Sequence, residues 1–171
     1  MKKVILITLI LVAGVTYVNA QAPLGKGGTQ LNAGFGFSSW GLPIYLGLDI
    51  GVHQDITIGP QVSFRSYAEK YRDPSGTTYT YDHSIFVFAF NGNYHFNTLL
   101  NIPSKWDLYA GLTLGYYYWT SPTGYLGTRT SGIGLDGQIG GRYFFSEKFG
   151  INLEFGGGTA SGGKIGITYK F

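Results

Sequence analysis

The sequence contains no cysteine in its 171 residues. This absence excludes a disulfide framework, a zinc–thiolate site, a cysteine nucleophile and a lipidated cysteine. Charge is also scarce, because only 12% of the residues are charged, about half the ~25% that is typical of soluble domains. An ordinary soluble surface is hard to build from so few charges, and the formal net charge of +3 gives little reason to expect nucleic-acid binding.

Aromatic residues and glycine are abundant instead. Aromatic side chains make up 17% of the chain, which argues against disorder, and there are 28 glycines. The length is that of a single domain. No second domain and no low-complexity tract can be distinguished along the chain.

The first twenty residues have the pattern of a secretory signal peptide. Lys2-Lys3 form a basic start, Val4 to Val15 is mostly apolar, and Val18-Asn19-Ala20 supplies small residues at the −3 and −1 positions of a cleavage site. A retained anchor helix is the alternative, but the apolar run is shorter than the ~20 residues that span a bilayer. We therefore expect residues 1–20 to be cleaved and residues 21–171 to form the folded domain.

The rest of the chain alternates apolar and polar residues with a period of two, which predicts β-strands. On the segment 107–119, for example, Leu112 and Leu114 share one face and Thr113 lies on the other. No later stretch has helical periodicity, so no helix is expected. The expected strands are residues 29–38, 44–52, 56–67, 81–96, 107–119, 132–145, 150–156 and 164–171.

The predicted connections differ in length. Residues 53–55 and 146–149 form tight turns, whereas residues 68–80 and 120–131 are longer, polar loops. Residues 97–106 form a long connection on the side that otherwise has short turns. This order predicts an all-β fold, an eight-stranded antiparallel up-and-down barrel.

The composition of the two faces indicates which one is inside. Only Asp82 places a charge on the apolar face, and the other face is rich in glycine, amides and hydroxyls. Small polar residues suit the narrow interior of an eight-stranded barrel, and a sheet can cross a bilayer only as a closed barrel. We therefore expect a transmembrane barrel with its apolar face towards lipid. A lipocalin-like barrel with the apolar face inside is the alternative.

Aromatic residues gather where the predicted strands end. In a membrane barrel such positions form girdles that flank an apolar band ~25 Å tall, and ordinary core aromatics are the alternative. The predicted girdle residues are Tyr94, Phe96, Tyr143, Phe145, Tyr169 and Phe171 at one end, and Tyr116 and Tyr118 at the other.

The last predicted strand places Ile167, Tyr169 and Phe171 on its outward face. This pattern resembles the signal by which the barrel-assembly machinery recognises outer-membrane proteins. Together with the strand pattern, Asn93–Phe96 before a turn and Lys105–Gly111 opening the next strand, it makes residues 27–171 similar to the small eight-stranded outer-membrane β-barrel family, which includes the OmpA membrane domain and OmpX.

The resemblance implies a place in the outer membrane of a Gram-negative cell. Contact with outer-membrane lipid and lipopolysaccharide, passage through the barrel-assembly machinery and a monomeric state are expected with it. The function expected is a structural or interaction role with a lumen filled by side chains. A narrow small-solute or ion pore and a periplasmic, lipocalin-like ligand-binding barrel are the alternatives.

Isolated charges on the polar face would be costly in a narrow lumen unless they are paired. A tight turn at residues 146–149 places Arg142 opposite Glu154, and the next hairpin brings Glu154 near Lys164. We expect these three to form one interior network that fills the lumen, although a path for small ions is the alternative. The complete predicted network is Asp49, Arg65, Asp136, Arg142, Glu154 and Lys164.

Catalytic and metal-binding patterns are weak. Asp82-His83-Ser84 is the one candidate cluster, but within a strand His83 points away from its two neighbours. The three histidines are dispersed, so no metal site, cofactor or enzyme activity is expected. The loop residues Glu69–Pro74, Tyr125 and Arg129 are interpreted as a solvated rim that touches lipopolysaccharide, or else as a docking site.

Overall fold

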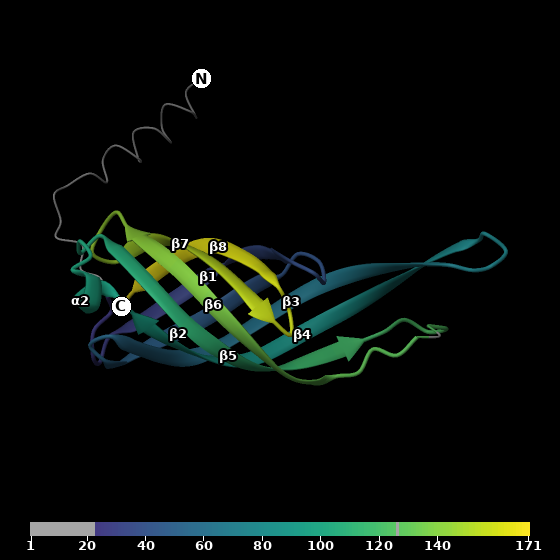
Figure 1. Cartoon of the computed structure of the whole chain (residues 1–171), viewed down its shortest axis with the longest axis horizontal. Helices are drawn as coiled ribbons and strands as arrows, with labels where there is room; N and C mark the ends of the chain where they lie inside the picture. The colour runs from purple at the N-terminus through teal and green to yellow at the C-terminus, as the bar shows by residue number, and fades with distance from the viewer. Residues whose placement is uncertain (1–22, 126) are drawn as a thin grey trace, which may run out of the picture.

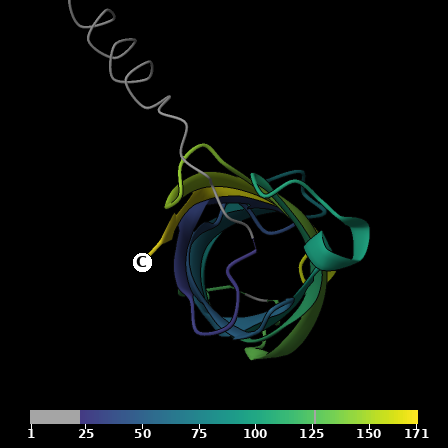
Figure 2. The same ribbon diagram turned by 90° about the vertical axis from the view of Figure 1, so that its left-hand side faces the viewer.

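The computed structural model describes residues 23–125 and 127–171, so the expected signal peptide lies outside the described residues. Each strand pairs antiparallel with its sequence neighbours, and β1 pairs with β8 to close an eight-stranded barrel (Figures 1 and 2). The strands are β1 (Thr29–Ser38), β2 (Ile44–His53), β3 (Ile56–Arg72), β4 (Thr78–His95), β5 (Trp106–Thr120), β6 (Gly132–Phe144), β7 (Phe149–Gly158) and β8 (Gly162–Lys170).

The two ends of the barrel differ in shape. At one end, called the short-turn end here, lie α2 (Asn97–Leu100) and the C-terminus. At the other, the long-loop end, β3 and β4 continue as a ribbon far beyond the other strands, beside the β5–β6 loop (Figure 1). Functional surface at the long-loop end therefore comes mainly from these two connections.

The sidedness of the sheet is the one expected for a membrane barrel. Phe88, Leu112 and Ile139 lie on the outside of the barrel, where their exposed fractions are 60%, 59% and 63%. Asn91 and Thr113, which alternate with them, are at most 8% exposed in the lumen. The lipocalin-like arrangement is therefore wrong for this chain. The exposed apolar face can be covered only by a hydrocarbon medium, because water would leave this large apolar area solvated.

The expected loop at residues 68–80 is wrong for most of its length. The β3–β4 ladder continues to the pair Arg72 and Thr78, and only residues 73–77 turn. Asp73 closes the turn, since its backbone N–H donates to the Thr77 carbonyl at 2.9 Å and its carboxylate accepts from the Thr77 N–H at 2.9 Å. Both faces of this ribbon lie beyond the barrel, so its sequence has no apolar face to produce a strand pattern.

The structure also has a short helix that the sequence pattern does not predict. The helix α2 is a single turn, too short for any periodicity. Asn97 fixes its start to β5, donating its side-chain N–H to the Trp106 carbonyl at 2.6 Å. No helix in the described ranges is both long and apolar enough to cross a membrane.

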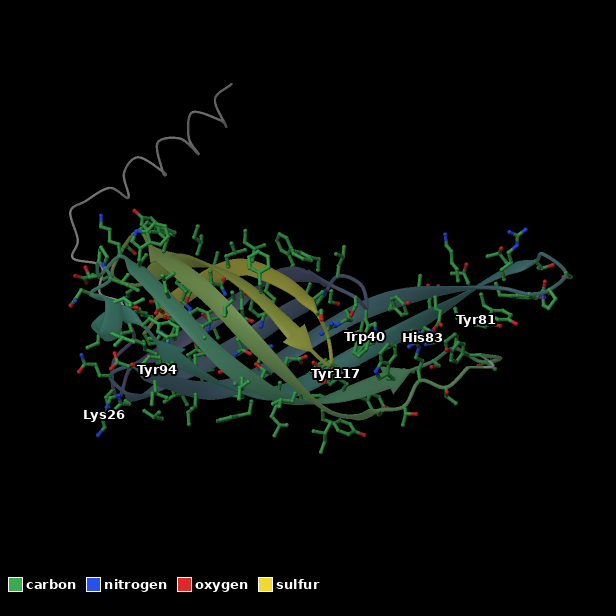
Figure 3. All side chains as sticks on the ribbon, in the orientation of Figure 1. Lys26, Trp40, Tyr81, His83, Tyr94 and Tyr117 are labelled. Atoms are coloured by element: carbon green, nitrogen blue, oxygen red, sulfur yellow. The ribbon has the colours of Figure 1, made fainter. Side chains whose placement is uncertain are left out.

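Aromatic rings gather at the short-turn end of the barrel exterior. Tyr169 packs on Phe171 with ring centroids 5.4 Å apart. The rings of Trp106 and Tyr143, on neighbouring strands, have centroids 4.7 Å apart. Figure 3 places Tyr94 at this end. These aromatic rings occupy the position of an interfacial girdle.

Candidate functional site

The short-turn half of the lumen is filled by a buried ionic cluster. Arg142 lies between two carboxylates, with its guanidinium 2.6 Å from Asp49 Oδ2 and 3.0 Å from Asp107 Oδ2. All three side chains are at most 3% exposed. Charge-assisted bonds of this kind offset the cost of burying the ions. The guanidinium also lies 4.4 Å from the centre of the Tyr109 ring.

The same cluster continues through a histidine. His95 Nδ1 is 2.6 Å from Asp107 Oδ1, and His95 Nε2 is 3.0 Å from the Thr57 hydroxyl. The order hydroxyl–imidazole–carboxylate is that of a nucleophilic triad, but all three groups are at most 1% exposed. With no room for a substrate, the arrangement ties β3, β4 and β5 together.

A second pair occupies the middle of the lumen. Lys164 Nζ is 2.6 Å from Glu154 Oε1 and donates to Gln61 Oε1 at 3.0 Å. The Tyr109 hydroxyl donates to Glu154 Oε2 at 3.0 Å. Gly140 leaves room for Tyr109, since a Cβ on this glycine would lie 2.4 Å from the tyrosine ring. The small residues of the lumen face therefore make space for a few large ones.

The expected pairing of Arg142 with Glu154 is wrong. The β6–β7 register pairs Arg142 with Asn152 and Gly140 with Glu154, two residues away from the expectation. Phe145 and Ser146 both donate their N–H to the Phe149 carbonyl, which makes a tighter turn than assumed. Arg142 consequently finds its partners on β2 and β5.

The predicted interior residues therefore form separate clusters. Lys164 and Glu154 are in contact, as are Arg142 and Asp49. The predicted network omits Asp107 and His95, although both lie on the polar face. The observed register of β4 and β5 pairs His95 with Tyr109, two residues from Asp107. The register of the β4–β5 pair is the information that would bring Asp107 and His95 together in a prediction from sequence.

The long-loop half holds the other two predicted charges. Asp136 accepts from the Tyr117 hydroxyl and, at 2.8 Å, from the Ala160 N–H. Arg65 donates to the Ser38 hydroxyl at 2.9 Å. A cavity of about 90 Å³ lies beside them in the lumen.

An aromatic layer covers this half of the lumen. Ile85 and Val87 point inwards from β4 and pack with Tyr117. Trp40 packs edge-on against Tyr117 and Trp119, with centroids 5.9 and 5.0 Å apart. Figure 3 shows Trp40 and Tyr117 where the barrel gives way to the ribbon. The sequence alone does not identify this layer, because its members come from β4, β5 and the β1–β2 connection, which are far apart along the chain.

His83 lies above the layer with partners that the local sequence does not supply. Its Nδ1 is 3.0 Å from the Ser121 hydroxyl, and its Nε2 is 3.4 Å from Glu69 Oε2. Asp82 and Ser84 are only its neighbours along the strand, so the local sequence does not reveal these partners.

The geometry around His83 does not fit a general base. Its Nε2 makes no hydrogen bond, and the ring is fully buried against the Tyr125 and Trp119 rings. Glu69, which would orient the imidazole, is already engaged by Arg129 at 2.8 Å. The described residues also contain no group of three or more metal-ligating side chains.

Glu69 joins the ribbon to the β5–β6 loop. Arg129 donates to it from Nε at 3.1 Å and from its terminal nitrogen at 2.8 Å, and the Tyr125 hydroxyl donates at 3.0 Å. The hydrogen bond from Arg129 lowers the pKa of Glu69, and the carboxylate in turn raises the pKa of Arg129. We call Glu69, Tyr125 and Arg129 the loop contact.

Comparison with solved structures identifies the architecture. The chain is similar to the outer-membrane protein OprG of Pseudomonas aeruginosa, with a TM-score of 0.73 over 90% of this chain and 99% of that one, at 11% identity. The fold is that of the small outer-membrane β-barrels. No family model and no curated protein sequence matches the chain.

Two further small outer-membrane barrels have the same fold. The N-terminal barrel domain of Pseudomonas aeruginosa OprF gives a TM-score of 0.59 at 13% identity, covering 86% of this chain and 99% of its own. Neisserial surface protein A also gives 0.59, at 16% identity, covering 84% and 96%.

Proposed function

We propose that this chain is an integral outer-membrane protein of a Gram-negative bacterium, in which the barrel is a stable support for the extracellular ribbon and loop. The observation that supports this proposal is the sidedness of the sheet, with Phe88 and Ile139 outside and Gln138 at 6% exposure inside. Only a lipid environment matches this distribution.

Extraction from membranes tests the location. We expect the chain to stay with the outer-membrane fraction after alkaline carbonate washing and to need detergent for release. We also expect the unheated protein to migrate differently from the boiled protein on a gel, because the closed barrel resists detergent. Release by osmotic shock alone would contradict the proposal.

We propose further that the short-turn half of the lumen is closed to solutes. The support is the Asp49–Arg142–Asp107 cluster, whose members are bonded across the barrel from β2, β5 and β6. The cavity in the other half favours a second candidate, a narrow solute pore. Planar-bilayer recordings decide between them, since a closed lumen gives no unitary current and resolved current steps would support the pore.

The surroundings of the protein are proposed from the same exterior. Lipopolysaccharide would contact the long-loop rim, and the barrel-assembly machinery would insert a monomer, with Ile167, Tyr169 and Phe171 of the last strand and C-terminus as its signal. Ile167 and Phe171 are exposed on the barrel exterior, which leaves them available for recognition. We propose a binding or structural role for the loops, without catalysis.

A further inference from the structure

A cavity of about 90 Å³ lies inside the barrel between the aromatic layer and the Lys164–Glu154 pair. A single water needs only ~10–15 Å³ of such volume, so the space admits several waters or one small organic molecule. Its lining combines the Ser63 hydroxyl and the Thr113 hydroxyl with apolar Val87 and Ala89. It is therefore a polar chamber with an apolar side.

Arg65 lines this chamber with incomplete bonding. Its side chain is only 7% exposed, its Nε has no hydrogen-bond partner, and one bond, to the Ser38 hydroxyl, is formed. Among the described residues, no carboxylate lies within 4.0 Å of it. A buried guanidinium with an unsatisfied donor is costly unless something accepts from it.

The other lumen charges already have partners. Lys164 is bonded to Glu154, and Arg142 to Asp49 and Asp107. Asp136 lines the same chamber, but its two oxygens accept from Tyr117 and Ala160. Of the cationic side chains that line the chamber, Arg65 therefore lacks a carboxylate partner within 4.0 Å among the described residues and keeps an unsatisfied Nε, while the chamber carboxylates are bonded to other groups.

We propose that this chamber is a binding site for a small monocarboxylate held by Arg65. The planar guanidinium matches the two oxygens of a carboxylate, and Ser63 is a further donor on the chamber wall. The short apolar tail of such a ligand faces Val87 and Ala89. Asp136 and Glu154 disfavour a doubly charged anion in the same space, because like charges repel strongly where water is scarce.

Acetate is the probe for this site. We would titrate the purified chain in detergent micelles at constant ionic strength and follow saturation transfer to the acetate methyl group by NMR. We expect saturable binding that weakens about tenfold or more in Arg65→Gln, the scale of a lost charge-assisted bond. Equal binding by the wild type and Arg65→Gln would overturn the proposal.

Two matched variants complete the test. Arg72→Gln removes an exposed arginine from the ribbon and should bind acetate as the wild type does. Ala89→Leu keeps every charge but fills the chamber, so acetate binding should be lost even if Arg65→Gln fails to fold. Unchanged binding in Ala89→Leu would place the acetate elsewhere and refute the site. Competition by sulfate as strong as by formate would refute the monocarboxylate class.

Discussion

At the scale of single residues, the lumen is organised around a few large or charged side chains placed among small ones. Arg142 bonds two carboxylates from different strands, and Tyr109 occupies space that Gly140 leaves open. Each of these side chains is surrounded so completely that its loss has no local compensation. Stability should therefore depend on individual lumen residues far more than on individual loop residues.

Replacing Arg142 tests this dependence. Arg142→Met keeps an unbranched side chain but leaves Asp49 and Asp107 buried without their cation, and breaking a buried ion pair in this way costs about 3–5 kcal/mol. We expect a loss of that size in the free energy of unfolding, measured by urea denaturation in lipid vesicles. Arg72→Met on the exposed ribbon is the control and should change stability by less than about 0.5 kcal/mol. A loss below about 1 kcal/mol for Arg142→Met would show that the cluster adds little.

At the scale of elements, the β3–β4 ribbon and the β5–β6 loop lie together at the long-loop end, and the loop contact supplies the ion pair between them. The ribbon has no barrel neighbour on either edge beyond Phe64 on β3 and Ser84 on β4, where pairing with β2 and β5 ends. Glu69 is its ionic connection to Arg129. The position of the ribbon should therefore follow the ionisation of one carboxyl group.

Acid should separate the two elements. Arg129 holds the pKa of Glu69 below its usual value of about 4.3, so the contact contributes fully above that value and is lost as pH falls through the lowered pKa. Because the chain has no cysteine, spin labels at Tyr79→Cys and Thr128→Cys can report the distance between the elements. We expect one short distance at neutral pH and a broad, longer distribution in strong acid.

The variant Glu69→Gln should show the broad distribution already at neutral pH, since the amide cannot form the ion pair. Glu147→Gln in the short turn between β6 and β7 is the matched control and should leave the distance unchanged. A distance that stays short in Glu69→Gln would mean that ring packing around His83 holds the loop without the ion pair.

At the scale of the whole molecule, the barrel has its apolar residues on the outside and its polar residues in the lumen, the reverse of a soluble globular protein. Leu112 lies near the middle of β5 and is 59% exposed, whereas Thr113 beside it is 8% exposed. Every backbone group of the closed sheet can pair within the barrel, which is what permits a sheet to cross lipid. A charge on the outer face should then be penalised according to its depth.

The substitution Leu112→Arg measures that depth. An arginine facing the middle of the bilayer costs about 2–4 kcal/mol, and the cost falls towards zero near the interfaces. We expect this loss when unfolding is followed in lipid vesicles. Tyr71→Arg, on the exposed ribbon, should have an effect within about 0.5 kcal/mol. Equal effects at the two positions would contradict a membrane boundary between them.

The sequence by itself determined the strand count and the direction in which each strand faces. These features follow from the period-two alternation of residues such as Leu112 and Thr113, which is a local property of the chain. The sequence also predicted that Glu154 lies near Lys164, because the short β7–β8 hairpin fixes the register of these two strands.

Only the tertiary structure decided which charges meet across the lumen. Arg142 contacts Asp49, 93 residues earlier in the chain, because closing the barrel brings their strands together. Glu69 likewise meets Arg129 only when two long connections rise from the same rim. The physical reason is that strand stagger and turn shape set these pairings, and a one- or two-residue change of register alters every contact across the barrel.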